Sequence, residues 1–115
     1  MPKKKNDKNN TAIPPQSSYD LAKVRSKIAG RQVLIKSDVL KDAWRDFGWG
    51  YSEILASYIK LKPKHFYKTE KSIYLPDVLL DFYKARINGE DIYTHFYIDK
   101  TENRLVINSF HKLTL

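Results

Sequence analysis

The sequence contains no cysteine, and this absence excludes several kinds of structure and chemistry. A chain without cysteine cannot build a disulfide scaffold, use a thiol nucleophile or bind zinc through thiolates. The absence also agrees with the reducing cytoplasm, where we expect this protein to act. No apolar run approaches the roughly 20 residues of a membrane span, and the polar, lysine-rich start lacks the apolar stretch of a secretory signal. We therefore expect no membrane association.

Other catalytic and cofactor motifs are missing as well. The four glycines are scattered, so no phosphate-binding glycine loop is present, and there is no serine nucleophile elbow. The three histidines do not have the spacing of a ligand motif, so we expect no metal site. We also expect no small-molecule cofactor.

Positive charge is what the chain has in excess. It has 115 residues, with 21 Lys and Arg against 13 Asp and Glu, and a formal net charge of +8. Residues 1–17 are polar and lysine-rich with hardly any apolar residue, which predicts a flexible basic tail. Residues 18–115 are enough for one domain, which keeps most of the net charge. A small basic domain attracts phosphate polyanions or acidic partners, although the charge could serve solubility alone.

The N-terminal half has the apolar spacing of helices. We predict helices from about Ser18 to Gly30, from Ser37 to about Phe47, and over 52–60, with a short strand at 32–36. In the second and third helices the apolar stripe places Trp44 and Ile59 toward the core.

From His65 onward, apolar and polar residues alternate. We predict strands near 65–74, 79–87, 91–98 and 104–111, with an Asn88-Gly89 hairpin turn between the second and third of them. Helices followed by a strand meander favour the α+β class. We expect about three N-terminal helices and a short strand packed on a C-terminal antiparallel sheet.

One phase of the alternating strands carries cations, phenols and imidazoles. Residues two apart in a strand share a face, so Tyr93 and His95 lie together. The sequence leaves open which mixed phase meets the core. A functional cluster is predicted if the register brings together the following residues: Lys68, Arg86, Tyr93, His95 and His111.

Each member of this cluster also has a structural interpretation. Lys68 is of a type that is usually exposed, and Tyr93 of a type common in strands. His95 could be a hydrogen-bonded structural histidine, and Arg86 could pair with Asp81 or Glu90.

Several short elements occur in an order and at spacings that are familiar. They are Tyr19-Asp20-Leu21, Val33, Leu61, Phe66-Tyr67-Lys68, Asp81, Tyr83, Arg86, Ile92-Tyr93, Ser109-Phe110 and Leu113. On these residues the chain resembles the motility quorum-sensing regulator (MqsR) toxin family from Tyr19 to Leu113. That family consists of bacterial messenger-RNA interferases related in fold to RelE.

The resemblance implies the toxin of a type II toxin–antitoxin system. Such a toxin is a sequence-selective endoribonuclease that cleaves single-stranded messenger RNA without the ribosome, and a cognate antitoxin protein neutralises it. Lys68 and Tyr93 match two of the family's catalytic groups. The family's glutamine position falls on Leu80, and its terminal lysine position falls on His111, with Lys112 next to it.

The same residues suit RNA cleavage on chemical grounds. The reaction needs a group that accepts the 2′-hydroxyl proton, positive charge at the phosphate and an acid for the departing 5′-oxygen. Imidazole titrates near neutrality, so His111 suits proton transfer, while Tyr93 is placed to orient the 2′-hydroxyl or donate a proton and Lys68 to hold phosphate. Tyr67, Lys84, Arg86, His95 and Lys112 are further candidates for RNA binding. The predicted reaction is a metal-independent transesterification that leaves a 2′,3′-cyclic phosphate.

Two other functions remain open from the sequence. A basic sheet with several tyrosines could bind single-stranded nucleic acid without cutting it, because tyrosines stack on bases. Alternatively, the basic face could pair with an acidic protein and touch no RNA.

Overall fold

A computed structural model describes residues 16–114, and the predicted basic tail at 1–17 lies outside this range except for its last two residues. Within it, the chain forms α2 (Leu21–Ala29), β1 (Val33–Ile35), α3 (Ser37–Phe47), α4 (Tyr51–Ile59), a short 3₁₀ turn η1 (Pro63–His65), β2 (Phe66–Lys71), β3 (Leu79–Ile87), β4 (Glu90–Asp99) and β5 (Arg104–Lys112).

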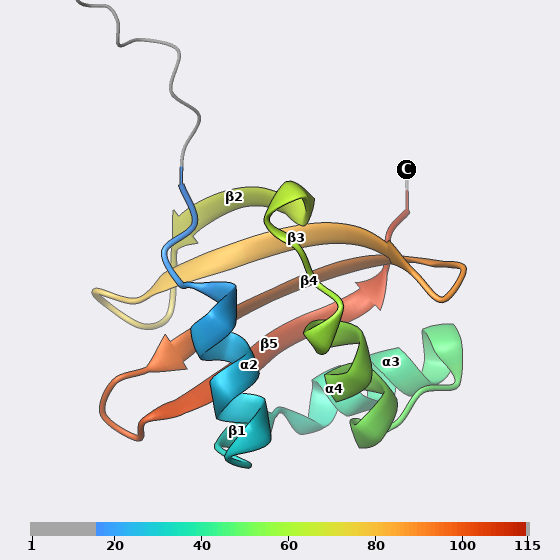
Figure 1. The fold of residues 1–115 in the computed structure, drawn as a ribbon, viewed down its shortest axis with the longest axis horizontal. Coiled ribbons are helices and arrows are strands. Elements are labelled where there is room, and N and C mark those ends of the chain that lie inside the picture. The colour runs from blue at the N-terminus through green and yellow to red at the C-terminus, as the bar shows by residue number, and fades with distance from the viewer. Residues whose placement is uncertain (1–15, 115) are drawn as a thin grey trace, which may run out of the picture.

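The strands form one five-stranded sheet in the order β1-β5-β4-β3-β2 (Figure 1). Strands β2 to β5 pair antiparallel in a meander, whereas β1 pairs parallel with β5. The predicted α+β class, with helices N-terminal to the sheet, is confirmed. The short strand belongs to the sheet as its parallel edge strand, where the prediction had it packed on an antiparallel sheet. At the β3–β4 turn, Asn88 and Gly89 both have positive φ angles (52° and 79°), as a tight hairpin requires.

The helices α2, α3 and α4 cover the same face of the sheet (Figure 1). The main core lies between these helices and the sheet. Val24 of α2, Val39 of α3 and Ile54 of α4 contribute to it from the helices, and they pack against strand residues such as Phe96 and Ile107. We call the opposite face of the sheet the open face. It carries a smaller apolar cluster: Leu80, Phe82, Tyr97 and Val106. No helix among residues 16–114 covers the open face, so its polar side chains are available to a ligand.

Two predicted core residues point to solvent. Trp44 is 67% exposed and Ile59 is 51% exposed, so their predicted inward orientation is wrong. In α3 the buried stripe contains Val39 and Ala43, and Trp44 lies one residue, about 100°, beyond Ala43 on the helix. In α4 the same relation holds between buried Tyr58 and Ile59. In both helices the residue one position earlier belongs to the buried stripe, so Trp44 and Ile59 lie at its exposed edge.

Asp81 fastens the segment before α2 to the sheet. Its carboxylate is fully buried and accepts the backbone N–H groups of Ser18 and Tyr19, each at 2.9 Å. Arg86 does not contact Asp81, because the two residues lie on opposite faces of β3. It pairs instead with Asp91 at 2.9 Å. The predicted pairing of Arg86 with Asp81 or Glu90 is wrong.

Replacing Asp81 by alanine is expected to lower the free energy of unfolding by about 3 kcal/mol, because two backbone donors lose a charged acceptor in a partly buried site. Urea unfolding followed by circular dichroism measures this loss. Glu102→Ala, at an exposed carboxylate in the β4–β5 turn, is the control and should change stability by less than about 0.5 kcal/mol. Equal stabilities for the two variants would contradict the structural role of Asp81.

Candidate functional site

Strand register assembles a row of ionisable side chains across the open face. Directly paired residues of neighbouring strands lie on the same face of a sheet. Lys84 of β3 pairs with Tyr93 of β4, and Tyr93 pairs with His111 of β5. In the adjacent row, Lys68 of β2 pairs with Phe82, and Phe82 pairs with His95. The two rows bring five predicted site residues onto one surface.

A β-bulge adds Tyr67 to this surface. The β2–β3 register shifts between Phe66 and Lys68, so one extra residue is inserted in β2. Phe66 packs on Tyr83 beneath the helices, while the ring of Tyr67 lies 6.3 Å from that of Tyr93. The bulge therefore presents Tyr67 and Lys68, which are neighbours in sequence, on the same face.

Tyr93 is the centre of the assembly. Its ring is parallel to the imidazole of His111, with an interplanar angle of 8° and 5.3 Å between ring centroids. The ammonium of Lys84 lies 3.7 Å from the ring centroid of Tyr67 and 5.9 Å from that of Tyr93. The ammonium of Lys68 lies 5.5 Å from the Tyr67 centroid. Two cations, two phenols and one imidazole thus form a continuous surface, which we call the 67–111 cluster: Tyr67, Lys68, Lys84, Tyr93 and His111.

The imidazole of His111 is held in one orientation. Its Nδ1 lies 3.0 Å from the backbone oxygen of Lys112. A carbonyl oxygen only accepts hydrogen bonds, so Nδ1 must carry the proton in this contact. In the neutral ring, Nε2 is then the unprotonated nitrogen, and it can accept a proton from a ligand or return it.

Lys68 forms an ion pair within β2. Its ammonium donates to the Glu70 carboxylate at 2.9 Å, and this hydrogen bond is the main cause of a raised pKa for Lys68. A raised pKa keeps Lys68 protonated at neutral pH, so it can supply positive charge but not act as a base. Glu70 was not among the predicted site residues, although it shares the phase of Lys68 in the strand.

His95 lies on the same face but in a different environment. Burial, followed by the nearby charges of His111 and Lys36, lowers the pKa of His95 to about 4. The ring is therefore neutral at pH 7. Its Nδ1 lies 3.2 Å from the amide nitrogen of Asn108, which can only donate, so Nδ1 is the accepting nitrogen. His95 is thus suited to hydrogen bonding, and less to acid–base catalysis.

A hollow of about 460 Å³ adjoins the 67–111 cluster on the open face. Its walls include Leu80, Phe82, His95, Tyr97, Lys36 and Asn108. Lys36 and Asn108 were not among the predicted site residues. A register shift between His95 and Phe96 inserts Asn108 into β5 as an extra residue, and the Lys36 ammonium then donates to its side-chain oxygen. Strict alternation could not indicate either residue.

Two predicted RNA-binding residues lie apart from the cluster. Arg86 is on the open phase but at the far end of β3, where it pairs with Asp91. Lys112 pairs with Ile92, a core residue on the helix-covered phase, and its backbone N–H donates to Asp46 at 2.9 Å. The structure does not bring the Lys112 side chain to the 67–111 cluster.

No group of three or more His, Cys, Asp or Glu side chains within 16–114 is placed to hold a metal ion. Over the same range, none of the helices combines the length and apolarity needed to cross a bilayer.

Comparison with known proteins does not assign the chain to a family. Neither the models of known protein families nor the curated proteins contain a match to this sequence.

Proposed function

We propose that this protein is an endoribonuclease that cleaves single-stranded RNA by metal-independent transesterification. The observation that supports this most directly is the stacking of Tyr93 on His111 beside the ammonium of Lys84, with the ammonium of Lys68 over the neighbouring Tyr67 ring. Phosphate needs the cations, while the 2′-hydroxyl and the leaving oxygen need groups that accept and donate protons. The 67–111 cluster contains both kinds of group on a surface open to solvent.

The reaction uses these groups in a defined way. Nε2 of His111 accepts the proton of the 2′-hydroxyl, and the 2′-oxygen attacks the adjacent phosphorus. As the O2′–P bond forms, the ammoniums of Lys68 and Lys84 stabilise the charge that develops on the phosphoryl oxygens. The P–O5′ bond then breaks, and the Tyr93 phenol donates a proton to the departing oxygen. The products are a 2′,3′-cyclic phosphate and a 5′-hydroxyl.

The aromatic side chains of the open face bind the RNA bases. Single-stranded RNA is held by stacking of its bases on aromatic rings and by hydrogen bonds to their edges. Tyr67 is 48% exposed and offers a stacking surface, while Phe82 and the neutral His95 line the adjoining hollow. A splayed nucleobase next to the scissile phosphate fits a cavity of this size and composition.

The biological setting follows from the resemblance to the MqsR toxins. On that basis the chain is the toxin of a type II toxin–antitoxin system in the cytoplasm, its substrate is messenger RNA, and its protein partner is a cognate antitoxin. A toxin of this kind needs its antitoxin encoded beside it.

A second candidate function is binding of single-stranded nucleic acid without cleavage. The observation in its favour is Leu80, which occupies the position of the family's catalytic glutamine and is 8% exposed in an apolar wall. The ion pair of Lys68 with Glu70 points in the same direction, because it partly neutralises a cation that catalysis would use.

An assay with end-labelled single-stranded RNA in excess EDTA separates the two functions. The enzyme is expected to cut the RNA in EDTA and leave a 2′,3′-cyclic phosphate at each new end. A matched RNA with 2′-deoxyribose at the cleaved positions should stay intact, because it lacks the nucleophile. RNA that is retarded on a gel but uncut would contradict the enzyme and support the binding module.

A further inference from the structure

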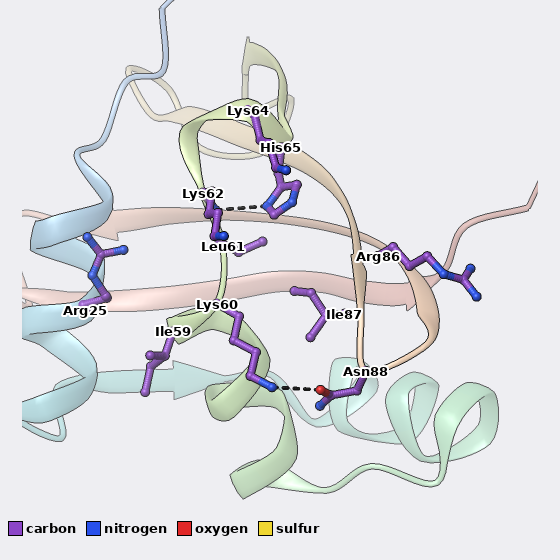
Figure 2. A pocket seen from close by; sticks show the side chains of 10 residues that line it. All are labelled: Arg25, Ile59, Lys60, Leu61, Lys62, Lys64, His65, Arg86, Ile87 and Asn88. Carbon is purple, nitrogen blue, oxygen red and sulfur yellow. Dashed lines mark hydrogen bonds between the residues drawn. The ribbon is translucent and has the colours of Figure 1, made fainter.

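A second positively charged surface lies before the start of β2, where α2, the end of α4, η1 and the β3–β4 turn surround a hollow of about 490 Å³ (Figure 2). Four of its lining residues form what we call the edge cations: Arg25, Lys60, Lys62 and Lys64. Of the residues that the structure describes, no carboxylate lines this hollow. Proteins usually intersperse charges of both signs on their surfaces, so a hollow lined by one sign calls for an anionic ligand.

The edge cations keep their charge available. The Lys60 ammonium donates to the side-chain oxygen of Asn88 at 2.8 Å, and an amide does not neutralise it (Figure 2). Arg25, Lys62 and Lys64 are exposed and make no ion pair with another residue of 16–114.

His65 adds a neutral donor among these cations. Its Nδ1 accepts the backbone N–H of Lys62 at 3.0 Å, so in the neutral ring Nε2 carries the proton (Figure 2). Burial is the main cause of a lowered pKa for His65, and the charges of Lys64 and Lys62 lower the pKa further. A neutral imidazole with one N–H group complements phosphate without adding to the repulsion between the cations.

The hollow is continuous with the open face. A shallower depression is lined by Lys64, His65 and Arg86, which also line the hollow, and by Lys84 of the 67–111 cluster. Lys84 is the residue whose ammonium lies over the Tyr67 ring. Cationic side chains therefore extend from the proposed cleavage site, around the end of β3, to the edge cations. The carboxylate on this path is Asp91, which pairs with Arg86 and leaves Lys84 and Lys64 on either side of the pair.

We propose that the edge cations bind the phosphate backbone of the same RNA strand, several nucleotides away from the scissile phosphate. This inference rests on the proposed function, because the strand that occupies the open face is the one that continues into the hollow. The hollow offers no aromatic stacking surface other than His65, so it holds backbone and not bases. Such contacts add affinity without adding sequence preference. An acidic protein is the less fitting occupant, because the centre of a protein–protein interface is rich in aromatic and apolar side chains. Here Phe, Tyr and Trp are missing from the lining, and of its apolar residues Ile59 is exposed whereas Leu61 and Ile87 are buried.

The test compares the binding of two RNA lengths. Both RNAs carry 2′-O-methyl groups throughout, so neither can be cut, and binding is measured whether or not the protein is an enzyme. One RNA has about five nucleotides and spans the open face, whereas the other has about sixteen and reaches the hollow. Dissociation constants are measured by fluorescence anisotropy in EDTA at several salt concentrations.

The variant Lys62→Gln/Lys64→Gln removes two edge cations from exposed positions, and circular dichroism verifies its fold. For the longer RNA we expect roughly ten-fold weaker binding and a salt slope reduced by about 1 to 2. Binding of the shorter RNA should be unchanged. The control Lys41→Gln/Lys100→Gln removes the same charge from α3 and the β4–β5 turn, away from the hollow. It should raise the dissociation constants of both RNAs slightly and by the same factor.

Three outcomes would overturn the proposal. The first is a Lys62/Lys64 variant that binds both RNAs like the control variant. The second is an equal loss for the two lengths, which would indicate a general charge effect. The third is the absence of RNA binding at either length, and this outcome would also remove the proposed function. If the longer RNA binds through the hollow but unmodified RNA is never cut, the edge-cation proposal stands and the endoribonuclease fails.

Discussion

Replacing Lys68 by alanine is expected to lower the rate of single-stranded RNA cleavage by about 100- to 1,000-fold, the usual loss when one group that stabilises transition-state charge is removed. Lys68 makes no contact that the core depends on: its ammonium lies over the rings of Tyr67 and Phe82 and pairs with exposed Glu70. The variant should therefore keep its fold, and the rate under single-turnover conditions measures the loss.

The control for this prediction is Lys41→Ala at an exposed position of α3. It removes an equal charge away from the open face, so its rate should stay within a few-fold of the wild-type rate. Lys68→Arg should recover part of the activity, because a guanidinium keeps the charge but changes the geometry of the contact. Undiminished cleavage by Lys68→Ala would remove this residue from the mechanism.

Replacing His111 by glutamine is expected to lower the cleavage rate by about 100- to 10,000-fold, the range for loss of a general acid–base group. Glutamine can still donate to the Lys112 carbonyl, as Nδ1 of His111 does, but its amide cannot exchange a proton near neutral pH. A further readout is the dependence of the rate on pH. The ascending limb that proton abstraction by imidazole produces should disappear in the variant.

Lys112→Gln is the matched control, since it changes the next residue of β5, whose register partner is Ile92 on the helix-covered phase. Its cleavage rate should be close to that of the wild type. His111→Lys restores the residue type that the MqsR resemblance implies at this position, and it should recover cleavage with an optimum at higher pH. Equal rates for His111→Gln and Lys112→Gln would show that the imidazole does not take part.

Much of the fold was predictable because the periodicity of the sequence changes at His65. Helical spacing before that residue and alternation after it give the α+β class, and the Asn88-Gly89 turn is confirmed by two positive φ angles. The partner of β1 was not predictable, because pairing with β5 joins Val33 to Leu105 across most of the chain. Nor did the apolar pattern indicate the exposure of Trp44, because small Ala43 is the residue that meets the sheet.

The candidate site was predictable only where the strands are regular. Lys84 and Tyr93 lie in the regular β3–β4 hairpin, where simple register pairs them. The bulge at Asn108 shifts the register of β5 by one residue, and this shift places His111 instead of Phe110 opposite Tyr93. Tyr67 and Asn108 sit at bulges, where one inserted residue shifts the phase, so alternation alone misplaces them. Lys36 reaches the site through a parallel pairing that the sequence does not encode locally.

The position of β5 between β4 and β1 has a consequence for how the protein is made. This strand is the last of the five in sequence, but it lies inside the sheet. Until residues 104–112 have been synthesised, β1 therefore has no partner strand, and the imidazole of His111 is missing from the open face. Contacts that bridge distant parts of a chain also form late, because closing a long loop costs entropy before the contacts repay it. If the protein is the proposed endoribonuclease, an unfinished copy on the ribosome therefore lacks the site that would cut RNA.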